Sequence, residues 1–184
     1  GLAAANLLRQ QGAAVVLFDQ WETPRPIGSG IILQPVGMSV LEALGAGEAM
    51  RALGAPITRL FGKSGRRVVL DVRYDALGKA APTGLGVHRG ALFQVLHEAA
   101  KAAGAEIESG RTVAGASFGR FEFADGRESA KFDLLIDAAG ARSPLAGGPP
   151  GLLGYGALWA SLDWTGTFGR AALEQRYEAA RKMV

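Results

Sequence analysis

The sequence has no cysteine and only two histidines among its 184 residues. Without thiols the chain can form neither disulfides nor thiolate metal sites. His88 and His97 are too few for a histidine-rich metal centre. No apolar run approaches the roughly 18 residues that a membrane-spanning helix needs. The sequence therefore argues against these metal sites and predicts no membrane partner.

The chain also lacks a strong excess of positive or negative charge. The formal net charge is +3, and the basic residues are scattered rather than gathered into a stripe with aromatic side chains. Proteins that bind nucleic acid usually concentrate Lys and Arg on one surface. We therefore expect no nucleic-acid partner.

What the chain does have is apolar mass and glycine. Hydrophobic residues make up 48% of the sequence, which is enough for a packed core. The 27 glycines follow no fixed period, which excludes collagen-like and repeat architectures. A chain of this length forms about one domain or part of a larger protein.

The first 19 residues form the most informative unit. Small and apolar residues predict a helix over 1–11, ended by Gly12, and a run of β-formers predicts a buried parallel strand over 14–18. Asp19 follows that strand, 18 positions after Gly1. In dinucleotide-binding βαβ units a glycine lets the helix approach the strand, and an acidic residue about 20 positions later binds ribose hydroxyls. From these residues alone, an ordinary βα unit with a surface aspartate remains open.

The rest of the chain mixes both periodicities. A helix is expected over 36–44, with an apolar face of Val36, Val40, Leu41 and Leu44. Other helices are expected over 47–53 and 89–103, a loop over 75–84, and a hairpin turn at Asp125-Gly126. Strands are expected over 31–33, 57–62, 67–73, 105–108, 111–118, 120–124, 132–136 and 155–164. This order predicts an α/β domain with a parallel sheet core and antiparallel additions.

Four segments, taken in order, resemble the FAD-dependent aromatic-ring monooxygenases, the group that includes salicylate and p-hydroxybenzoate hydroxylases. They are residues 1–19, Arg25-Pro26-Ile27-Gly28-Ser29-Gly30-Ile31 with Leu33-Gln34-Pro35, His88-Arg89-Gly90-Ala91-Leu92, and residues 133–143. Each motif is moderately specific, and the ordered set is stronger than any one of them. One position departs from the family pattern: Ala139 stands where the family usually has an aspartate linked to FAD and reduced-nicotinamide binding.

The resemblance implies a Rossmann-like FAD-binding domain whose first strand and first glycines would lie upstream of residue 1. It places this domain at 1–150, with inserted strands near 55–75, and the start of an antiparallel substrate-side β region at 151–184. The fragment alone would then be inactive. For the tail 171–184 propensity favours helix, whereas the resemblance implies strand, and we predict strand.

The resemblance also implies roles for individual residues. Asp19 would bind the ribose, Gln20 the adenine edge and Arg89 an anion such as the pyrophosphate, and Arg25 could reach the same cofactor. The N-terminus of the first helix would face the same pyrophosphate. Gly30 and Ile31 would lie beside the flat flavin ring. The full set of cofactor-binding candidates is Gly1, Asp19, Gln20, Arg25, Gly30, Ile31, Arg89, Val113, Ala138 and Gly140.

No catalytic side chain and no metal are expected, because the flavin carries the chemistry. In the family, NADH or NADPH reduces FAD, and oxygen is then transferred to a small aromatic substrate. A homodimer remains open, and the intracellular cofactor with the absence of cysteine suggests a cytoplasmic protein. Two alternatives also stay open: another FAD- or NAD-linked Rossmann oxidoreductase, such as a flavin reductase or halogenase relative, and a degenerate non-catalytic module.

Four further residues have plainer interpretations. Arg142 and Ser143 are expected to cap the turn after the strand at 132–136, and Trp159 and Trp164 to pack in a sheet.

Overall fold

The computed structural model describes residues 1–23, 28–78, 82–148, 154–163, 165–167, 169–178 and 181–184. The chain divides into two compact units. The first comprises Gly1–Pro26 with Leu96–Leu158, and the second Ile27–Val95 with Trp159–Val184. Each unit is a mixture of α and β structure, as the order of patterns predicted.

The first unit opens with the predicted helix and strand. Helix α1 (Leu2–Gln10) ends at Gly12, whose φ of +85° is one that glycine adopts readily. Strand β1 (Val16–Phe18) pairs in parallel with β7 (Glu106–Glu108), so its predicted direction is confirmed, although the strand is half-buried. Helix α4 (Arg89–Ala102) precedes β7, and Arg9 Nε of α1 donates to the Ala103 carbonyl at 3.1 Å.

An aromatic cluster holds the end of β1. The ring of Phe18 meets Phe121, Phe123 and Phe132 edge to face, with centroids 5.8, 5.1 and 6.2 Å away. Two of these rings come from β9 (Arg120–Phe123), which pairs antiparallel with β8 (Val113–Ser117). Such pairs add stability beyond their buried area. The cluster thus joins β1 to the β8–β9 hairpin.

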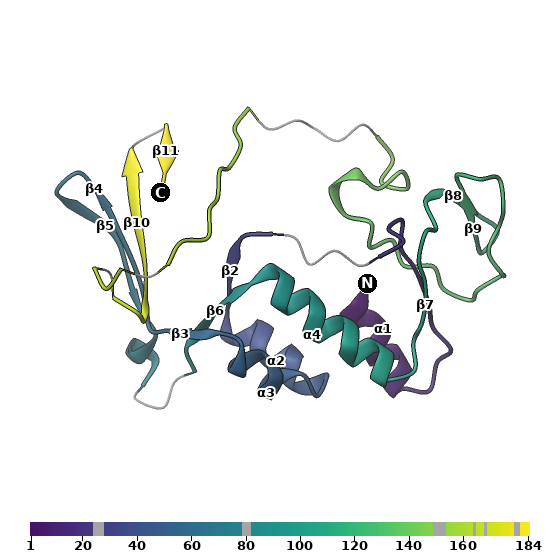
Figure 1. The fold of residues 1–184 in the computed structure, drawn as a ribbon, viewed down its shortest axis with the longest axis horizontal. Coiled ribbons are helices and arrows are strands. Elements are labelled where there is room, and N and C mark those ends of the chain that lie inside the picture. The colour runs from purple at the N-terminus through teal and green to yellow at the C-terminus, as the bar shows by residue number, and fades with distance from the viewer. Residues whose placement is uncertain (24–27, 79–81, 149–153, 164, 168, 179–180) are drawn as a thin grey trace. The chain divides into compact units, whose positions relative to one another are not determined.

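The second unit contains a three-stranded antiparallel sheet in the order β2-β6-β3, formed by β2 (Gly30–Leu33), β6 (Gly84–His88) and β3 (Ala55–Ile57). Helices α2 (Pro35–Ala43) and α3 (Gly47–Ala52) follow β2, and the helix pair is visible beside this sheet in Figure 1. Buried hydrophobic residues here include Leu41, Leu44, Met50, Leu85 and Val87.

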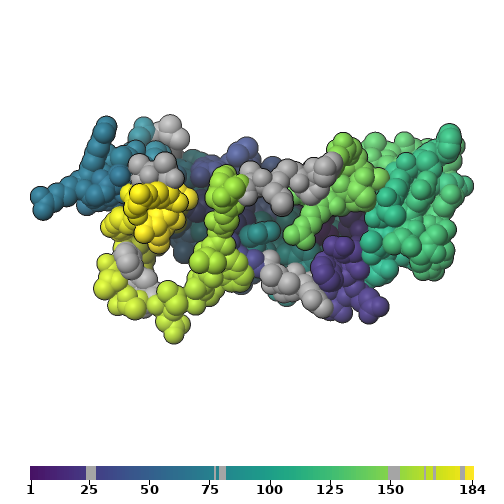
Figure 2. Space-filling view, turned by 90° about the horizontal axis from the view of Figure 1, so that it is seen from above, coloured from purple at the N-terminus to yellow at the C-terminus, as the bar shows by residue number. Residues whose placement is uncertain are grey.

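The same unit has a four-stranded sheet in the order β11-β10-β4-β5. Its strands are β4 (Arg59–Ser64), β5 (Arg67–Arg73), β10 (Ala172–Glu178) and β11 (Lys182–Met183). Strand β10 runs parallel to β4, so the C-terminal strands lie against the β4–β5 hairpin (Figures 1 and 2). The tail is therefore strand, as predicted, because pairing with β4 outweighs its helical propensity.

Several expectations about the chain were wrong. Residues 132–136 form no strand, and Leu134 and Ile136 are 65% and 46% exposed. Residues 155–163 form no strand either, and Trp159 is exposed rather than packed in a sheet. Trp164 lies outside the described residues. An apolar run becomes a strand only where a neighbouring strand bonds its N–H and C=O groups, and no described strand pairs with these segments.

The predicted apolar face of α2 was also partly wrong. Leu41 and Leu44 are buried, but Val36 and Val40 are 73% and 44% exposed. Met38 is buried instead. The expected loop over 75–84 contains most of a 3₁₀ turn, η1 (Tyr74–Leu77), and its last residue starts β6, a strand that the apolar pattern did not indicate.

Helices and strands elsewhere fall close to their predicted ranges. The predicted strand 57–62 is divided at Thr58 between β3 and β4. At the predicted hairpin turn, Gly126 has a φ of +82° and Arg127 N–H donates to Asp125 Oδ1 at 3.0 Å. No helix among the described residues is long and apolar enough to cross a bilayer.

We predict that Phe18→Ala destabilises the first unit strongly. The change removes three edge-to-face contacts of a half-buried ring, so the loss should lie near or below the low end of the roughly 3–5 kcal/mol typical of phenylalanine truncation in cores. Phe118→Ala is the matched control, because that ring is 93% exposed and should contribute almost nothing. Urea unfolding of both variants measures the difference, and equal losses would contradict the role assigned to Phe18.

Candidate functional site

The candidate residues of the first unit gather around the end of β1. Asp19 follows Phe18 and is half-exposed. Its Oδ1 accepts the Trp21 N–H at 2.9 Å, and its backbone N–H donates to the Glu108 carbonyl at 3.0 Å. Among the described residues no donor reaches Oδ2. The carboxylate is thus held in one orientation by β7 and Trp21, with one oxygen left to accept a hydrogen bond.

The start of α1 lies close to the same strand. A Cβ placed on Gly1 would be 3.6 Å from Ala138 Cβ and 3.8 Å from Leu17 Cδ2, so Gly1, β1 and Ala138 are neighbours. Helix α1 has no side-chain cap at its N-terminus, which leaves the first N–H groups as donors. The structure therefore brings together Gly1 and Ala138, two residues that are 137 positions apart in the sequence.

The loop that contains Ala138 is organised by Asp137. Its Oδ1 accepts the Ala139 N–H at 3.0 Å, and its Oδ2 accepts the Ser143 hydroxyl at 2.7 Å. These bonds, the backbone one first, hold the pKa of Asp137 below its usual range. Ser143 is buried and its Oγ also accepts the Leu145 N–H, so it caps this turn as expected. Both carboxylate oxygens of Asp137 are used inside the loop, so it does not replace the aspartate missing at Ala139.

The remaining candidates of this unit are less constrained. Gln20 is exposed. Val113 begins β8 and pairs with Phe123, one of the rings of the aromatic cluster. Gly140 has a φ of +81° at the start of the turn η2 (Gly140–Arg142). Asp19, Gly1 and Ala138 are therefore the candidates for which the structure gives a defined setting.

In the second unit the central feature is the packing of Arg89 against Gly28. Gly28 has a φ of +145°, and a Cβ there would lie 2.9 Å from Arg89 Cβ, 3.0 Å from Cδ and 3.1 Å from Nε. Arg89 N–H donates to the Ser29 carbonyl at 3.1 Å. Arg89 is the first residue of α4 and is exposed. No described residue accepts a hydrogen bond from its guanidinium. A cation at a helix N-terminus opposes the helix dipole, so this position favours an anionic ligand.

Gly30 and Ile31 lie on the neighbouring strand. Gly30 pairs with His88 and Ile31 with Val87 in the β2–β6 ladder. Among the described residues, a Cβ on Gly30 would find only the Val87 carbonyl, at 3.8 Å, so this part of the chain leaves space over the glycine for a ligand. Residues of a strand alternate between faces, and directly paired residues share one. Gly30, Ile32 and Gly86 therefore share a face with His88. Arg25, the other cation of this segment, lies outside the described residues.

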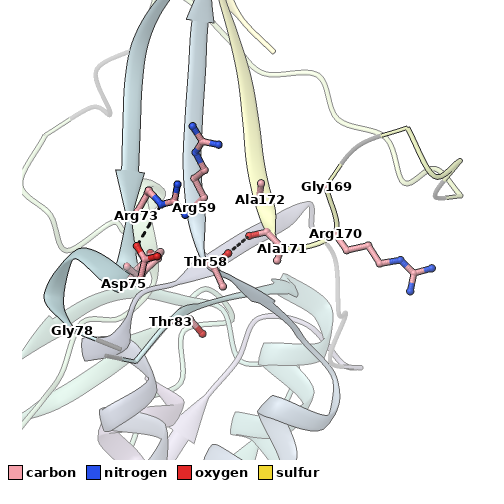
Figure 3. Close-up of a pocket in the computed structure, with 11 residues that line it drawn as sticks. Thr58, Arg59, Arg73, Asp75, Gly78, Thr83, Gly169, Arg170, Ala171 and Ala172 are labelled. Carbon is pink, nitrogen blue, oxygen red and sulfur yellow. Dashed lines mark hydrogen bonds and ion pairs between the residues drawn. The ribbon is translucent and has the colours of Figure 1, made fainter. Parts of the chain in front are cut away.

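A cavity of about 640 Å³ opens at the base of the β4–β5–β10 sheet (Figure 3). Its lining residues are Thr58, Arg59, Arg73, Tyr74, Asp75, Gly78, Thr83, Gly169, Arg170, Ala171 and Ala172. Two of its arginines already have carboxylate partners: Arg59 makes a two-point ion pair with Asp71 at 2.7 and 2.8 Å, and Arg73 lies 3.4 Å from Asp75. The Arg59 guanidinium holds the pKa of Asp71 below its usual range. Arg59, Arg73 and Asp75 of the cavity wall are therefore all in ion pairs.

No individual role was predicted from the sequence for Tyr74 or Gln34. Tyr74 lines this cavity and is hydrogen-bonded to Gln34. Tyr74 is 7% exposed, and its hydroxyl donates to Gln34 Oε1 at 2.5 Å. No local pattern could have indicated this contact, because the two residues are 40 positions apart; Gln34 occupies the N-cap position of α2 but makes no cap bond. No group of three or more potential metal-ligating side chains occurs within the described ranges.

Comparison with known proteins gives a consistent result. A family model described as "FAD binding domain" matches residues 1–144. The chain is 31% identical over 148 residues to the 2-heptyl-3-hydroxy-4(1H)-quinolone synthase of Mycobacteroides abscessus, which is 79% of this chain and 38% of that protein. It is 33% identical over 112 residues to asperlicin C monooxygenase of Petromyces alliaceus, covering 58% of this chain and 24% of that protein.

Among solved structures, the tetrameric form of 2-methyl-3-hydroxypyridine-5-carboxylic acid oxygenase is similar with a TM-score of 0.70 and 27% identity. The match covers 79% of this chain and 38% of that one. The chain thus spans less than two-fifths of the length of these relatives.

The Asp137 loop yields a pH prediction. Because its pKa is lowered in the folded protein, its contribution to stability is fully present above the ordinary value of about 3.9 and is lost as pH falls through the lowered pKa. Ser143→Ala removes one of the two bonds and should raise the pKa of Asp137 toward the ordinary value. Carboxyl-carbon NMR titration measures this shift. Ser39→Ala, whose hydroxyl bonds only the Val36 carbonyl, is the control and should leave the pKa unchanged.

Proposed function

The chain belongs to the FAD-binding domain family, and from that premise we propose that it is part of a monooxygenase that uses NADH or NADPH and O₂ to hydroxylate a small aromatic substrate. The observation that carries this proposal is the family match over residues 1–144, which includes the proposed cofactor residues of both units. FAD is the cofactor for which the family is named.

The residues of the first unit fit the adenosine half of FAD. Asp19 offers a carboxylate oxygen that no described residue uses, and ribose hydroxyls are the donors it would accept. The N-terminus of α1 offers uncapped N–H groups, which suit a pyrophosphate. Gly1 and Ala138 add no bulk near these donors. Gln20, Val113 and Gly140 remain proposed contacts of the same cofactor.

The residues of the second unit fit the flavin half and an anionic group. Gly30 leaves open space over β2, where a flat ring can approach the backbone, and Ile31 follows it. The guanidinium of Arg89 has no partner among the described residues, and it can pair with a phosphate in two-point geometry. Arg25 is proposed for the same role from the sequence alone.

Bound FAD would supply the redox and oxygen chemistry, so this chain's own residues need only bind, orient and shield. The names of the relatives support an aromatic ring as substrate: a quinolone synthase, a hydroxypyridine-carboxylic acid oxygenase and a monooxygenase. We propose that residues 1–150 form the FAD-binding domain and 151–184 the start of the substrate-side β region. In support, β10 and β11 extend the sheet built on the inserted strands β4 and β5. Homodimer formation and a cytoplasmic location stay proposals.

Ala139 favours one alternative, a flavoprotein module without nicotinamide-driven turnover. The nearest aspartate, Asp137, is committed to its own loop and offers no substitute. The two functions differ in one measurable step. A hydroxylase reduces its bound flavin with NADH or NADPH, whereas the module binds flavin that these donors leave oxidised.

We predict that the full-length protein purifies with bound flavin, visible in its absorption spectrum, and that aromatic substrates stimulate its oxidation of NAD(P)H. Asp19→Asn should weaken FAD binding about ten- to hundredfold, the usual value of a charged hydrogen bond. Glu106→Gln removes an exposed carboxylate on neighbouring β7 and is the control. A colourless wild-type protein that also fails to take up added FAD would overturn the proposed function.

The packing of Arg89 on Gly28 gives a second prediction. Gly28→Ala places a methyl group within about 3 Å of Arg89 Cβ, Cδ and Nε, so the arginine must move and FAD affinity should fall at least tenfold. Gly65→Ala also adds a methyl group at a positive φ, but with no neighbour within 4 Å. FAD titration of both variants separates the displacement of Arg89 from backbone strain. Equal affinities would contradict the proposed role of this contact.

A further inference from the structure

Tyr74 is held in the second unit by contacts of both its backbone and its side chain. Its backbone N–H donates to the Thr58 carbonyl at 3.1 Å. Its hydroxyl occupies the space over Gly84, where a Cβ would come within 2.8 Å of the phenol oxygen. Only glycine at 84 leaves room for this ring, which is 7% exposed and lines the cavity. The phenol is therefore held at the junction of η1 and β6.

The phenol fixes the orientation of the Gln34 carboxamide. The distance of 2.5 Å between Tyr74 Oη and Gln34 Oε1 suits an O–H···O bond and is too short for an N–H donor. The carboxamide oxygen therefore faces the phenol, and its NH₂ group, with two donors, faces away. Within the part of the chain that is described, no acceptor binds that NH₂ group.

The position of Gln34 at the end of β2 indicates which face of the strand its NH₂ group lies on. Gln34 is exposed, follows β2 directly and precedes Pro35, the first residue of α2. It caps none of the helix N–H groups, although it occupies the N-cap position. By the alternation of a strand it continues the face of Gly30 and Ile32. Gly30 is the residue over which the structure leaves open space.

We propose that Tyr74 is a positioning residue, which holds Gln34 so that its amide N–H donates to an acceptor atom of the bound flavin ring. This inference rests on the proposed function. The flavin ring carries carbonyl oxygens and ring nitrogens that accept hydrogen bonds. A donor fixed by a buried partner needs no reordering when the ring binds, which is why a preorganised group contributes more than a mobile one.

The experiment uses the full-length protein and FAD as the probe. Gln34→Glu keeps an acceptor for the Tyr74 hydroxyl but removes both N–H donors, and Gln34→Met removes the whole amide at similar length. Tyr74→Phe keeps the ring and removes the hydroxyl. Tyr177→Phe is the matched control, because that hydroxyl donates to Gln175 Oε1 at the same 2.5 Å in the same unit, away from β2. Melting without FAD shows whether each variant folds.

We expect both Gln34 variants to bind FAD roughly two- to tenfold more weakly, the usual value of one hydrogen bond, and to shift the absorption bands of the bound flavin. Tyr74→Phe should act in the same direction, and should have no further effect once Gln34 is Met, because it acts only through that amide. Tyr177→Phe should keep the wild-type affinity and bands.

Two results would overturn the inference while leaving the proposed function intact. One is a set of Tyr74 and Gln34 variants that bind FAD with wild-type affinity and unshifted bands, including the case where only the KM for the aromatic substrate changes. The other is a Tyr74→Phe effect that persists in full in the Gln34→Met background, which would mean that the phenol acts on packing alone. A wild-type protein that binds no FAD would instead refute the proposed function.

Discussion

The pairing of β2 with β6 is the interaction on which the candidate site of the second unit depends. The ladder sets Gly30 opposite His88, so the next residue, Arg89, meets the Ser29 carbonyl and packs on Gly28. At the other end of the ladder β6 begins with Gly84, which leaves room for the Tyr74 phenol. A slip of one residue would turn every side chain of β2 to the opposite face. Cofactor residues and their support are thus fixed by one register.

In the first unit the parallel pair of β1 and β7 positions the candidate residue Asp19. Within the described part of the chain, strand β1 pairs with β7 alone, and its last residue, Phe18, contacts the ring cluster. The orientation of Asp19 follows from this arrangement, because its N–H bonds the Glu108 carbonyl one step beyond the ladder. Parallel pairs are slightly weaker per residue than antiparallel ones. The aromatic contacts therefore contribute more here than they would in a larger sheet.

Local signals predicted the opening helix and strand, the helices 36–44 and 89–103 and the hairpin turn, because caps, glycines and apolar spacing act over a few residues. The strand at 132–136 failed because its composition suits a buried strand, whereas burial depends on a neighbour that no local pattern reveals. Strand β6 was missed for a related reason, since Gly84 and Gly86 weaken the β signal, and Gly84 is needed to make room for Tyr74. Asp19 and Arg89 could be found from spacing and motif. The Tyr74–Gln34 contact, between residues 40 positions apart, could not.

Hydrogen-bonding capacity separates structural from ligand-binding polar groups in this chain. Asp137 and Asp71 are both acidic and largely solvated, but each has both carboxylate oxygens bonded within its own unit, and the lowered pKa of each follows from those bonds. Among the residues that the structure describes, none bonds the second oxygen of Asp19 or the guanidinium of Arg89, whereas Arg59 is bound at two points. A polar group that is held in one orientation but has no partner within the protein can bind a ligand without first losing an existing hydrogen bond. Asp19, Arg89 and the Gln34 amide meet both conditions, and each adjoins a glycine or a strand end where a ligand can approach.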